Sequence, residues 1–214
     1  MMKSLVFTTA SMLMMGSTVL AGSLETAVSD ATVTPMPIAA PTVTDFSGFY
    51  AGLAIGSIGN GTGTYIYDGT PGDSYGLEGE GYGLYAGYNF QRDKLVYGAE
   101  VAALSTDGKM PDFGPETYLN STIDLKGRLG YVLGDALAYG FVGYSTGDWD
   151  NYNGLTNPNL TGPNYGVGVD YLINDSWIVG AEYIHRTLEA GFEENDNGIE
   201  AEFGMVQLRV GYSF

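Results

Sequence analysis

The sequence of 214 residues contains no cysteine, one histidine, and only 8 lysines and arginines against 25 aspartates and glutamates. Without cysteine the chain forms neither a disulfide framework nor a thiolate metal site. The formal net charge of −17 excludes a nucleic-acid partner, because contacts to a phosphate backbone require clustered lysine and arginine. Charged residues make up only 15% of the chain, which is too few for an intrinsically disordered protein.

Long apolar runs are missing except at the amino terminus. There Lys3 precedes an apolar stretch from Leu5 to about Met15, and Val19–Ala21 supplies small residues for cleavage. This arrangement predicts a signal peptide over residues 1–21, which is removed from the mature protein. No later stretch offers the roughly 18 consecutive apolar residues of a membrane helix. If the chain crosses a membrane, it must therefore do so as a closed barrel, since lipid offers no partner to an open sheet edge.

Glycine and tyrosine are abundant, at 33 and 17 residues, and apolar residues alternate with polar or small ones. The alternation is clearest in the last strand, where the apolar positions are Val206, Leu208, Val210, Tyr212 and Phe214. One face of such a strand is apolar and the other is polar. A strand of about ten residues, tilted by about 40°, spans about 25 Å, the height of an outer-membrane apolar band.

Comparable alternation recurs upstream. The predicted strands cover residues 46–57, 81–91, 95–103, 123–133, 136–146, 165–171, 177–183 and 205–214. Three short turns alternate with four long polar connections, the first of which runs to about Leu77. This pattern predicts an all-β fold, an eight-stranded antiparallel up-and-down transmembrane β-barrel over residues 46–214. Residues 22–45, with three spaced prolines, are predicted to form a flexible periplasmic linker.

Aromatic residues mark one end of the predicted barrel. Tyr88, Phe90, Trp177, Tyr212 and Phe214 fall near the short turns, where an aromatic girdle belongs. On the strand that follows the Gly134–Asp135 turn, we place Tyr139 and Phe141 on the outward face.

Several segments together resemble a known family. They are FSGFYAGLAIG (46–56), GYNFQRDKLVYGAEVAAL (87–104), LKGRLGYVLGDAL (125–137), YGVGVDYLINDSWIVGAEYIH (165–185) and VQLRVGYSF (206–214). Their order and spacing resemble the small outer-membrane β-barrels of the opacity-porin-like family, related to the OmpA transmembrane domain. The resemblance implies a bacterial outer-membrane location, a structural or surface role, and no catalytic residues. The aromatic ending also resembles the terminal signal that the barrel assembly machinery recognises, which assigns Tyr212 and Phe214 as the assembly signal.

Charged residues at inward positions are the main candidate site. Four acids and four bases point inward, among them Asp124 and Arg186. The other six lie at similar mid-barrel heights: Glu100, Lys126, Arg128, Asp170, Glu182 and Arg209. Glu100 is expected to pair with Lys126 or Arg128, and Glu182 with Arg209, because an unpaired buried charge is very costly. The network forms either a solute or proton path or, as we favour for an eight-stranded barrel, a self-satisfied polar plug.

Two further groups of residues could carry chemistry. His185, Thr187 and Glu189 form a faint hydrolase-like trio, for which the sequence supports no geometry. The acidic clusters 148–151 and 193–198 could hold Ca²⁺, but neither matches a full calcium loop, and solvated surface charge is the default interpretation. We therefore expect no catalytic residue, no cofactor and no metal site.

The sequence thus predicts a monomeric outer-membrane protein with a structural or surface-interaction role and acidic extracellular loops. The alternatives are a small-solute porin and, third, a lipid-modifying enzyme. The expected partners are outer-membrane lipid and lipopolysaccharide, the barrel assembly machinery, and an unknown extracellular ligand of the loops.

Overall fold

The structure is a computed structural model that describes residues 43–110, 112, 118–150, 159–191 and 197–214. The predicted signal peptide, 1–21, and most of the predicted linker, 22–42, lie outside the described residues. Within the described ranges, no helix is long and apolar enough to cross a membrane.

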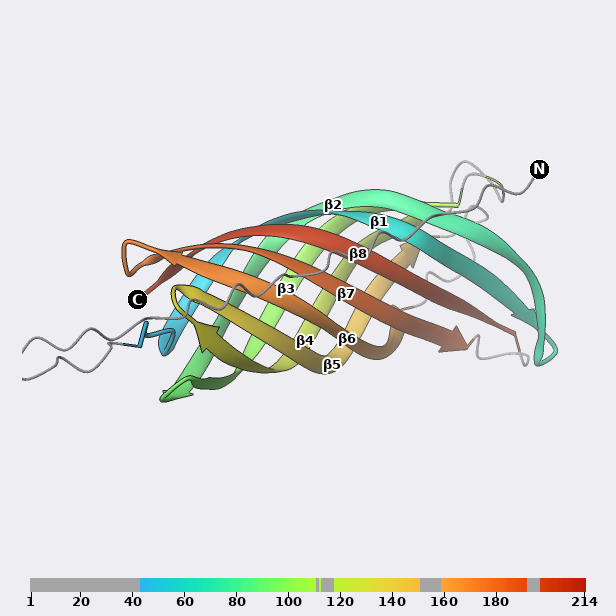
Figure 1. The fold of residues 1–214 in the computed structure, drawn as a ribbon. Helices are drawn as coiled ribbons and strands as arrows, with labels where there is room; N and C mark the ends of the chain where they lie inside the picture. The colour runs from blue at the N-terminus through green and yellow to red at the C-terminus, as the bar shows by residue number, and fades with distance from the viewer. Residues whose placement is uncertain (1–42, 111, 113–117, 151–158, 192–196) are drawn as a thin grey trace, which may run out of the picture. The chain divides into compact units, whose positions relative to one another are not determined.

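Eight antiparallel strands form a closed ring in which each strand pairs with the next and β8 pairs with β1 (Figure 1). The strands are β1 Gly48–Tyr67, β2 Thr70–Arg92, β3 Leu95–Lys109, β4 Tyr118–Leu133, β5 Ala136–Asp150, β6 Asn159–Ile173, β7 Trp177–Gly191 and β8 Gly198–Ser213. The closing pair runs from Tyr50 opposite Ser213 to Ile66 opposite Gly198. The predicted all-β, eight-stranded fold is confirmed.

The two faces of each strand differ in the way the alternation predicts. On β8, Val206 and Leu208 are 58% and 61% exposed, whereas Gln207 and Arg209 are 2% exposed. Apolar side chains thus cover the outside while polar ones are buried, the reverse of a water-soluble protein. Near the short turns, the ring of Tyr212 lies 5.5 Å from that of Trp177 and 5.3 Å from that of Phe214, as part of an aromatic girdle.

The predicted orientation of β5 is wrong. Tyr139 and Phe141 point into the barrel and are each 5% exposed, while Val142 and Tyr144 lie on the outward face at 69% and 56%. A small barrel interior must be filled, and bulky aromatic rings fit there when glycine stands opposite. Tyr139 lies against Gly168 of the neighbouring strand β6.

The prediction of a first long polar loop, running to about Leu77, is also wrong. β1 continues to Tyr67, a two-residue turn follows at Asp68 and Gly69, and β2 starts at Thr70. Above the apolar band the outward face meets water, so the apolar alternation that reveals a strand disappears there. At this height the Glu80 amide donates to Asp107 at 2.7 Å, and this hydrogen bond lowers the pKa of the Asp107 carboxyl.

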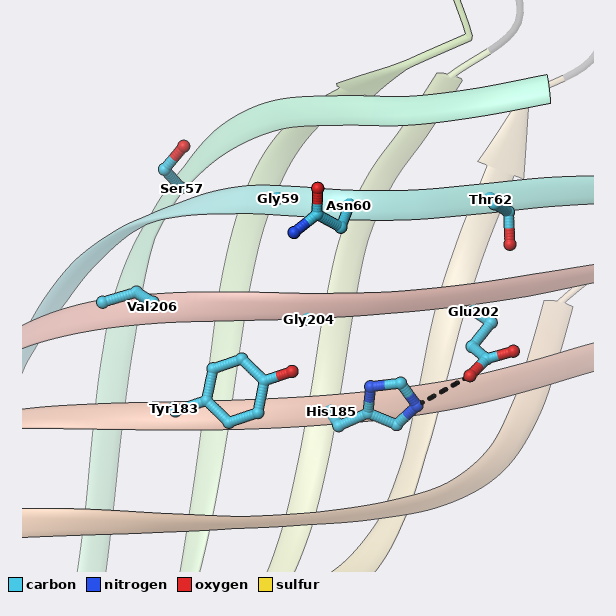
Figure 2. Close-up of a pocket in the computed structure, with 9 residues that line it drawn as sticks. All are labelled: Ser57, Gly59, Asn60, Thr62, Tyr183, His185, Glu202, Gly204 and Val206. Atoms are coloured by element: carbon cyan, nitrogen blue, oxygen red, sulfur yellow. Dashed lines mark ion pairs between the residues drawn. The ribbon is translucent and has the colours of Figure 1, made fainter. Parts of the chain in front are cut away.

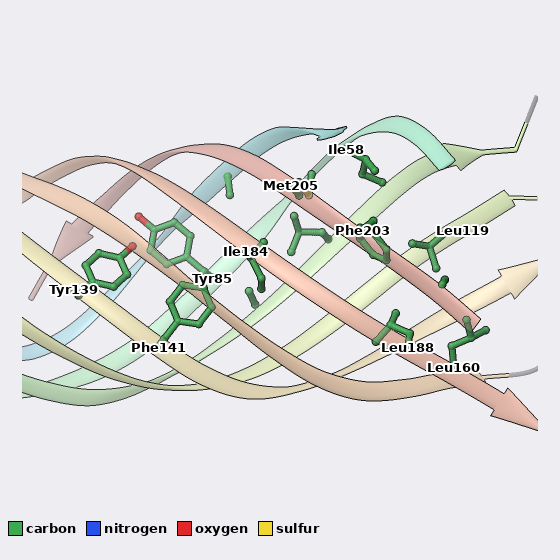
Figure 3. Packing of buried hydrophobic residues seen from close by; sticks show 14 of the residues in the cluster. Ile58, Tyr85, Leu119, Tyr139, Phe141, Leu160, Ile184, Leu188, Phe203 and Met205 are labelled. Carbon is green, nitrogen blue, oxygen red and sulfur yellow. The ribbon is translucent and has the colours of Figure 1, made fainter. Parts of the chain in front are cut away.

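Apolar side chains fill the interior of the barrel in the half towards the long connections (Figure 3). The most deeply buried of them are at most 1% exposed: Leu77, Met110, Leu119, Trp149, Leu160, Ile184, Leu188, Ile199, Ala201, Phe203 and Met205. At the short-turn ends of β3 to β7, a second apolar group is buried to 1–6% exposure: Val96, Val132, Leu137, Leu172 and Ile178. The charged interior positions lie between these two groups.

The residues just before β1 are tied to the short-turn end. Phe46 is buried, its amide donates to the Gln91 side chain at 2.8 Å, and its carbonyl accepts from Asn89 at 3.2 Å. The Thr44 hydroxyl donates at 2.8 Å to Asp135, in the turn between β4 and β5. Because β4 and β5 lie opposite β1 in the ring, this segment reaches across the short-turn mouth.

Candidate functional site

The charged interior lies at mid-height in the barrel, and all six residues selected from the sequence point into it. Each is at most 5% exposed: Glu100, Lys126, Arg128, Asp170, Glu182 and Arg209. They come from β3, β4, β6, β7 and β8, so the closure of the ring brings them together.

Glu100 is the centre of this network. Its Oε2 accepts from Arg209 Nη2 at 2.5 Å and from Arg128 Nη1 at 3.0 Å. Its Oε1 accepts from Lys126 Nζ at 3.1 Å. Three cations therefore share one carboxylate, and further acids are required to balance their charge.

Glu182 and Asp170 supply this balance. Glu182 accepts from Lys126 Nζ at 2.5 Å and pairs through its other oxygen with Arg209. Asp170 accepts from Arg128 Nη2 at 2.7 Å. Three acids and three bases make the network formally neutral, and each pair anticipated in the sequence is in contact. Such mutual pairing offsets the cost of removing these charges from water.

Tyrosines complete the network. Tyr139 donates to Glu182 at 3.0 Å, accepts from Arg209 at 3.1 Å, and its ring centroid lies 3.8 Å from the Arg128 guanidinium. The Tyr50 hydroxyl donates to Glu100 at 3.0 Å and accepts from Arg128 at 2.8 Å. Sequence reasoning missed Tyr139 because it assigned this residue to the outward face.

A separate ion pair lies nearer the long connections. Arg186 donates to both carboxylate oxygens of Asp124, from Nε at 2.9 Å and from Nη2 at 2.6 Å. Ser145 also donates to Asp124, at 2.7 Å, and Asn164 donates to Ser145 at 2.8 Å. The two parallel bonds from a guanidinium fix the geometry of this pair. All eight inward charges recognised in the sequence are therefore buried and paired.

The hydrolase-like trio does not assemble into a triad in the described contacts. His185, Thr187 and Glu189 lie on the outer side of β7, and His185 Nε2 lies 3.2 Å from Glu202 Oε1 on β8. This contact therefore joins His185 to a residue outside the trio.

The acidic clusters lie partly beyond the described residues. In the first, Asp148 accepts from Ser121 at 2.7 Å, and Trp149 is fully buried inside the barrel. Residues 193–196 of the second lie outside the described residues. Among the residues that the structure describes, no group of three or more His, Asp or Glu is arranged to hold a metal ion.

The residues proposed as the assembly signal lie at the short-turn end on the outward face. Phe214 is 79% exposed and its amide donates to the Phe49 carbonyl at 2.9 Å, while Tyr212 is 39% exposed. The last residue thus joins the first strand at the seam of the barrel.

A closed eight-stranded ring with an apolar outside and a charged, paired interior defines the class of small outer-membrane β-barrels. The chain belongs to the outer membrane protein beta-barrel domain family, whose model matches residues 31–214. It is therefore a protein of the bacterial outer membrane, and the end that carries the turns between β2 and β3, β4 and β5, and β6 and β7 faces the periplasm.

Two relatives agree with this assignment, and a solved structure shows a similar fold. The chain is 25% identical over 215 residues to the 25 kDa outer-membrane immunogenic protein of Brucella ovis, covering 100% of this chain and 98% of the relative. It is 26% identical over 176 residues to the 22 kDa outer membrane protein of Rhizobium leguminosarum bv. viciae, covering 79% and 78%. Its fold is similar to that of the outer membrane protein OprG from Pseudomonas aeruginosa, with a TM-score of 0.54, 13% identity, and coverage of 81% and 99%.

Proposed function

We propose that this barrel has a structural and surface-interaction role and that its lumen is closed to solutes. The observation that carries the proposal is the filled interior, with a neutral ion-pair network at mid-height and buried apolar side chains above and below it. An eight-stranded barrel has an interior just wide enough for side chains to fill, whereas open porins use about 16–18 strands.

Among the described residues, buried apolar side chains flank the charged layer on both sides, so a permeating solute would meet them at each end. At the periplasmic end the solute would have to displace buried Val96 and Leu172, together with Phe46 across the mouth. At the extracellular end it would have to displace Trp149 and Phe203, which are at most 1% exposed. A small ion or polar solute would lose most of its hydration where it passes these apolar side chains, which costs free energy.

The surface role rests on the extracellular side of the barrel. The Brucella relative is named as an immunogenic protein of the outer membrane, which supports a role at the cell surface. The strands of this chain extend beyond the apolar band, and the acidic loops expected from the sequence would meet an extracellular ligand on that side. We assign no catalytic role, because the ionisable groups inside the barrel are engaged with one another.

Planar-bilayer recording of the purified wild-type protein tests the closed lumen. The expected result is little or no steady conductance, with an added 16-stranded porin as the positive control for the membrane. The Arg209→Ala variant should unfold more readily in urea and still form no stable channel. Stable, well-resolved channels from the wild-type monomer would overturn the proposal in favour of a small-solute porin.

A further inference from the structure

A groove of about 560 Å³ lies on the outer surface of the barrel, across β7, β8 and β1 (Figure 2). The groove is outside the lumen, because Ser57, Thr62, Tyr183 and Val206 on its walls are exposed residues on the outward faces of their strands. Its lining is Ser57, Gly59, Asn60, Thr62, Tyr183, His185, Glu202, Gly204 and Val206.

A bulge in β1 and a glycine in β8 create the hollow. The pairing of β1 with β8 shifts register between Gly59 and Thr62, and Asn60 has a φ of 53°. Such a left-handed conformation is uncommon for a non-glycine residue, and bulges often redirect a side chain beside a functional site. A side chain at Gly204 would collide with the Tyr183 ring, whereas a side chain at Gly59 would meet open space.

The groove lies at the upper boundary of the apolar band. Tyr183 on β7 and Val206 on β8 are the exposed large apolar residues farthest towards the extracellular side, and on β1 the next one after Ile55 is Tyr67, at the far end of the strand. The next lining residues towards the extracellular side are polar, with Ser57 on β1 and His185 on β7. In an outer membrane this is the height at which the headgroups of outer-leaflet lipids meet their acyl chains.

The lining offers hydrogen-bonding groups that suit a sugar better than a phosphate. His185 Nε2 lies 3.2 Å from Glu202 Oε1, and Asn60 and Tyr183 add an amide and a phenol hydroxyl to the lining. The described residues that line the groove include no lysine or arginine. A phosphate favours clustered arginine or lysine, while a carboxylate, an amide and hydroxyls can pair with the hydroxyl and acylamino groups of a sugar.

We propose that this groove binds the glycosyl headgroup of an outer-leaflet glycolipid through its hydroxyl and acylamino groups, with the acyl chains lying against Val206 and Ile55. The proposal rests on the outer-membrane location of the chain and not on the closed lumen. Conductance through the wild-type protein would therefore contradict the proposal of a closed lumen but would not contradict the proposed glycolipid site.

His185 provides a direct readout, because it is the only histidine in the chain. The full-length mature protein, labelled at histidine, is placed in phosphatidylcholine nanodiscs and its imidazole signals are followed by NMR. One series adds an acylated glucosamine disaccharide without phosphates, a second adds the same lipid with its phosphates, and a third adds phosphatidic acid. We expect a saturable shift with both glucosamine lipids and none with phosphatidic acid.

Three variants make the test specific. Gly59→Leu fills the groove from a position with open space, and Asn60→Gly removes the carboxamide while keeping a residue that tolerates the left-handed backbone. Each should weaken the response to the glucosamine lipids by about ten-fold or more in affinity. Ser105→Leu, at an exposed outward position above the apolar residues of β3, is the matched control and should bind as the wild type does.

Folding of each variant is checked by its heat-dependent shift on a gel, and Asn60→Gly alone decides the test if Gly59→Leu does not fold. An equal response to phosphatidic acid would show that the groove binds phosphate, or lipids in general, and would overturn the proposal. Unchanged binding in the groove variants that fold would also overturn it.

Discussion

Arg209 on β8 donates to Glu100 on β3 at 2.5 Å, joining two residues that are 109 positions apart in the chain. Because β3 and β8 are not neighbours in the ring, this bond crosses the interior. The same guanidinium also pairs with Glu182 on β7. One side chain thus connects three strands from inside the barrel.

Replacing Arg209 by alanine should destabilise the barrel strongly. The change leaves Glu182 and Glu100 each without one cationic partner, and breaking a buried pair costs about 3–5 kcal/mol, less if water enters the interior. The free energy of unfolding in urea measures this loss. Arg92→Ala, which removes an exposed arginine at the end of β2, is the control and should change stability little. Equal stability of both variants would contradict the network.

Removing only the hydroxyl of Tyr139 should also reduce stability. Tyr139→Phe keeps the ring beside Arg128 but removes hydrogen bonds to Glu182 and Arg209, and a hydrogen bond to a charged group contributes about 1.5–3 kcal/mol. Tyr144→Phe, on the outward face of the same strand, is the matched control and should be nearly neutral. If Tyr144→Phe were destabilised more than Tyr139→Phe in urea, Tyr144 would be the residue that points into the barrel and Tyr139 the one that points outward.

Arginine on the outward face should be costly within the apolar band. Leu208→Arg and Val169→Arg place a charge against lipid, which costs about 2–4 kcal/mol at the midplane. Ser105→Arg, at an exposed position above the apolar residues of β3, should cost much less. Unfolding of the protein in lipid vesicles compares the three variants. The same cost for all three would mean that these outward faces do not meet lipid.

The carboxy-terminal aromatics should be required for assembly. Changing both Tyr212 and Phe214 to serine should leave the chain unassembled in the periplasm, as cell fractionation and the absence of a heat-modifiable band would show. The control changes Tyr97 and Tyr171 to serine, two exposed aromatics near other short turns. Normal assembly of the Tyr212 and Phe214 variant, or equal failure of the control, would argue against a signal located in the last strand.

The strands that cross the apolar band could be predicted because lipid on one side and a polar interior on the other impose a strict alternation. Val206 to Phe214 shows this clearly, with exposed Leu208 and buried Arg209 side by side. The rule failed on β5, where Leu137, Tyr139 and Phe141 make the inward face the more apolar one. Inside a narrow barrel, the packing of an aromatic ring against glycine decides which face of a strand points inward more than the polarity of that face does. The sequence of one strand does not show which glycines of neighbouring strands will lie opposite its aromatic residues.

The charged network could be predicted from inward positions and their heights, since each residue lies on a strand with recognisable phase. The contribution of Tyr139 could not, because it depends on the orientation of β5. The extension of β1 to Tyr67 and the groove beside Asn60 were also missed. They lie at the upper boundary of the apolar band or above it, where outward residues need not be apolar and the sequence carries no periodic signal.

The position of the outer groove has a consequence for the assembly of the barrel. Its walls come from both sides of the join between β8 and β1, the last and the first strand of the ring. The groove therefore does not exist until the two ends of the sheet have met. A lipid held there would bind only the finished ring, and binding to one state stabilises that state against the others. Such a lipid would stabilise the pairing of β8 with β1, and it would bind closed barrels but not barrels in which these two strands are still unpaired.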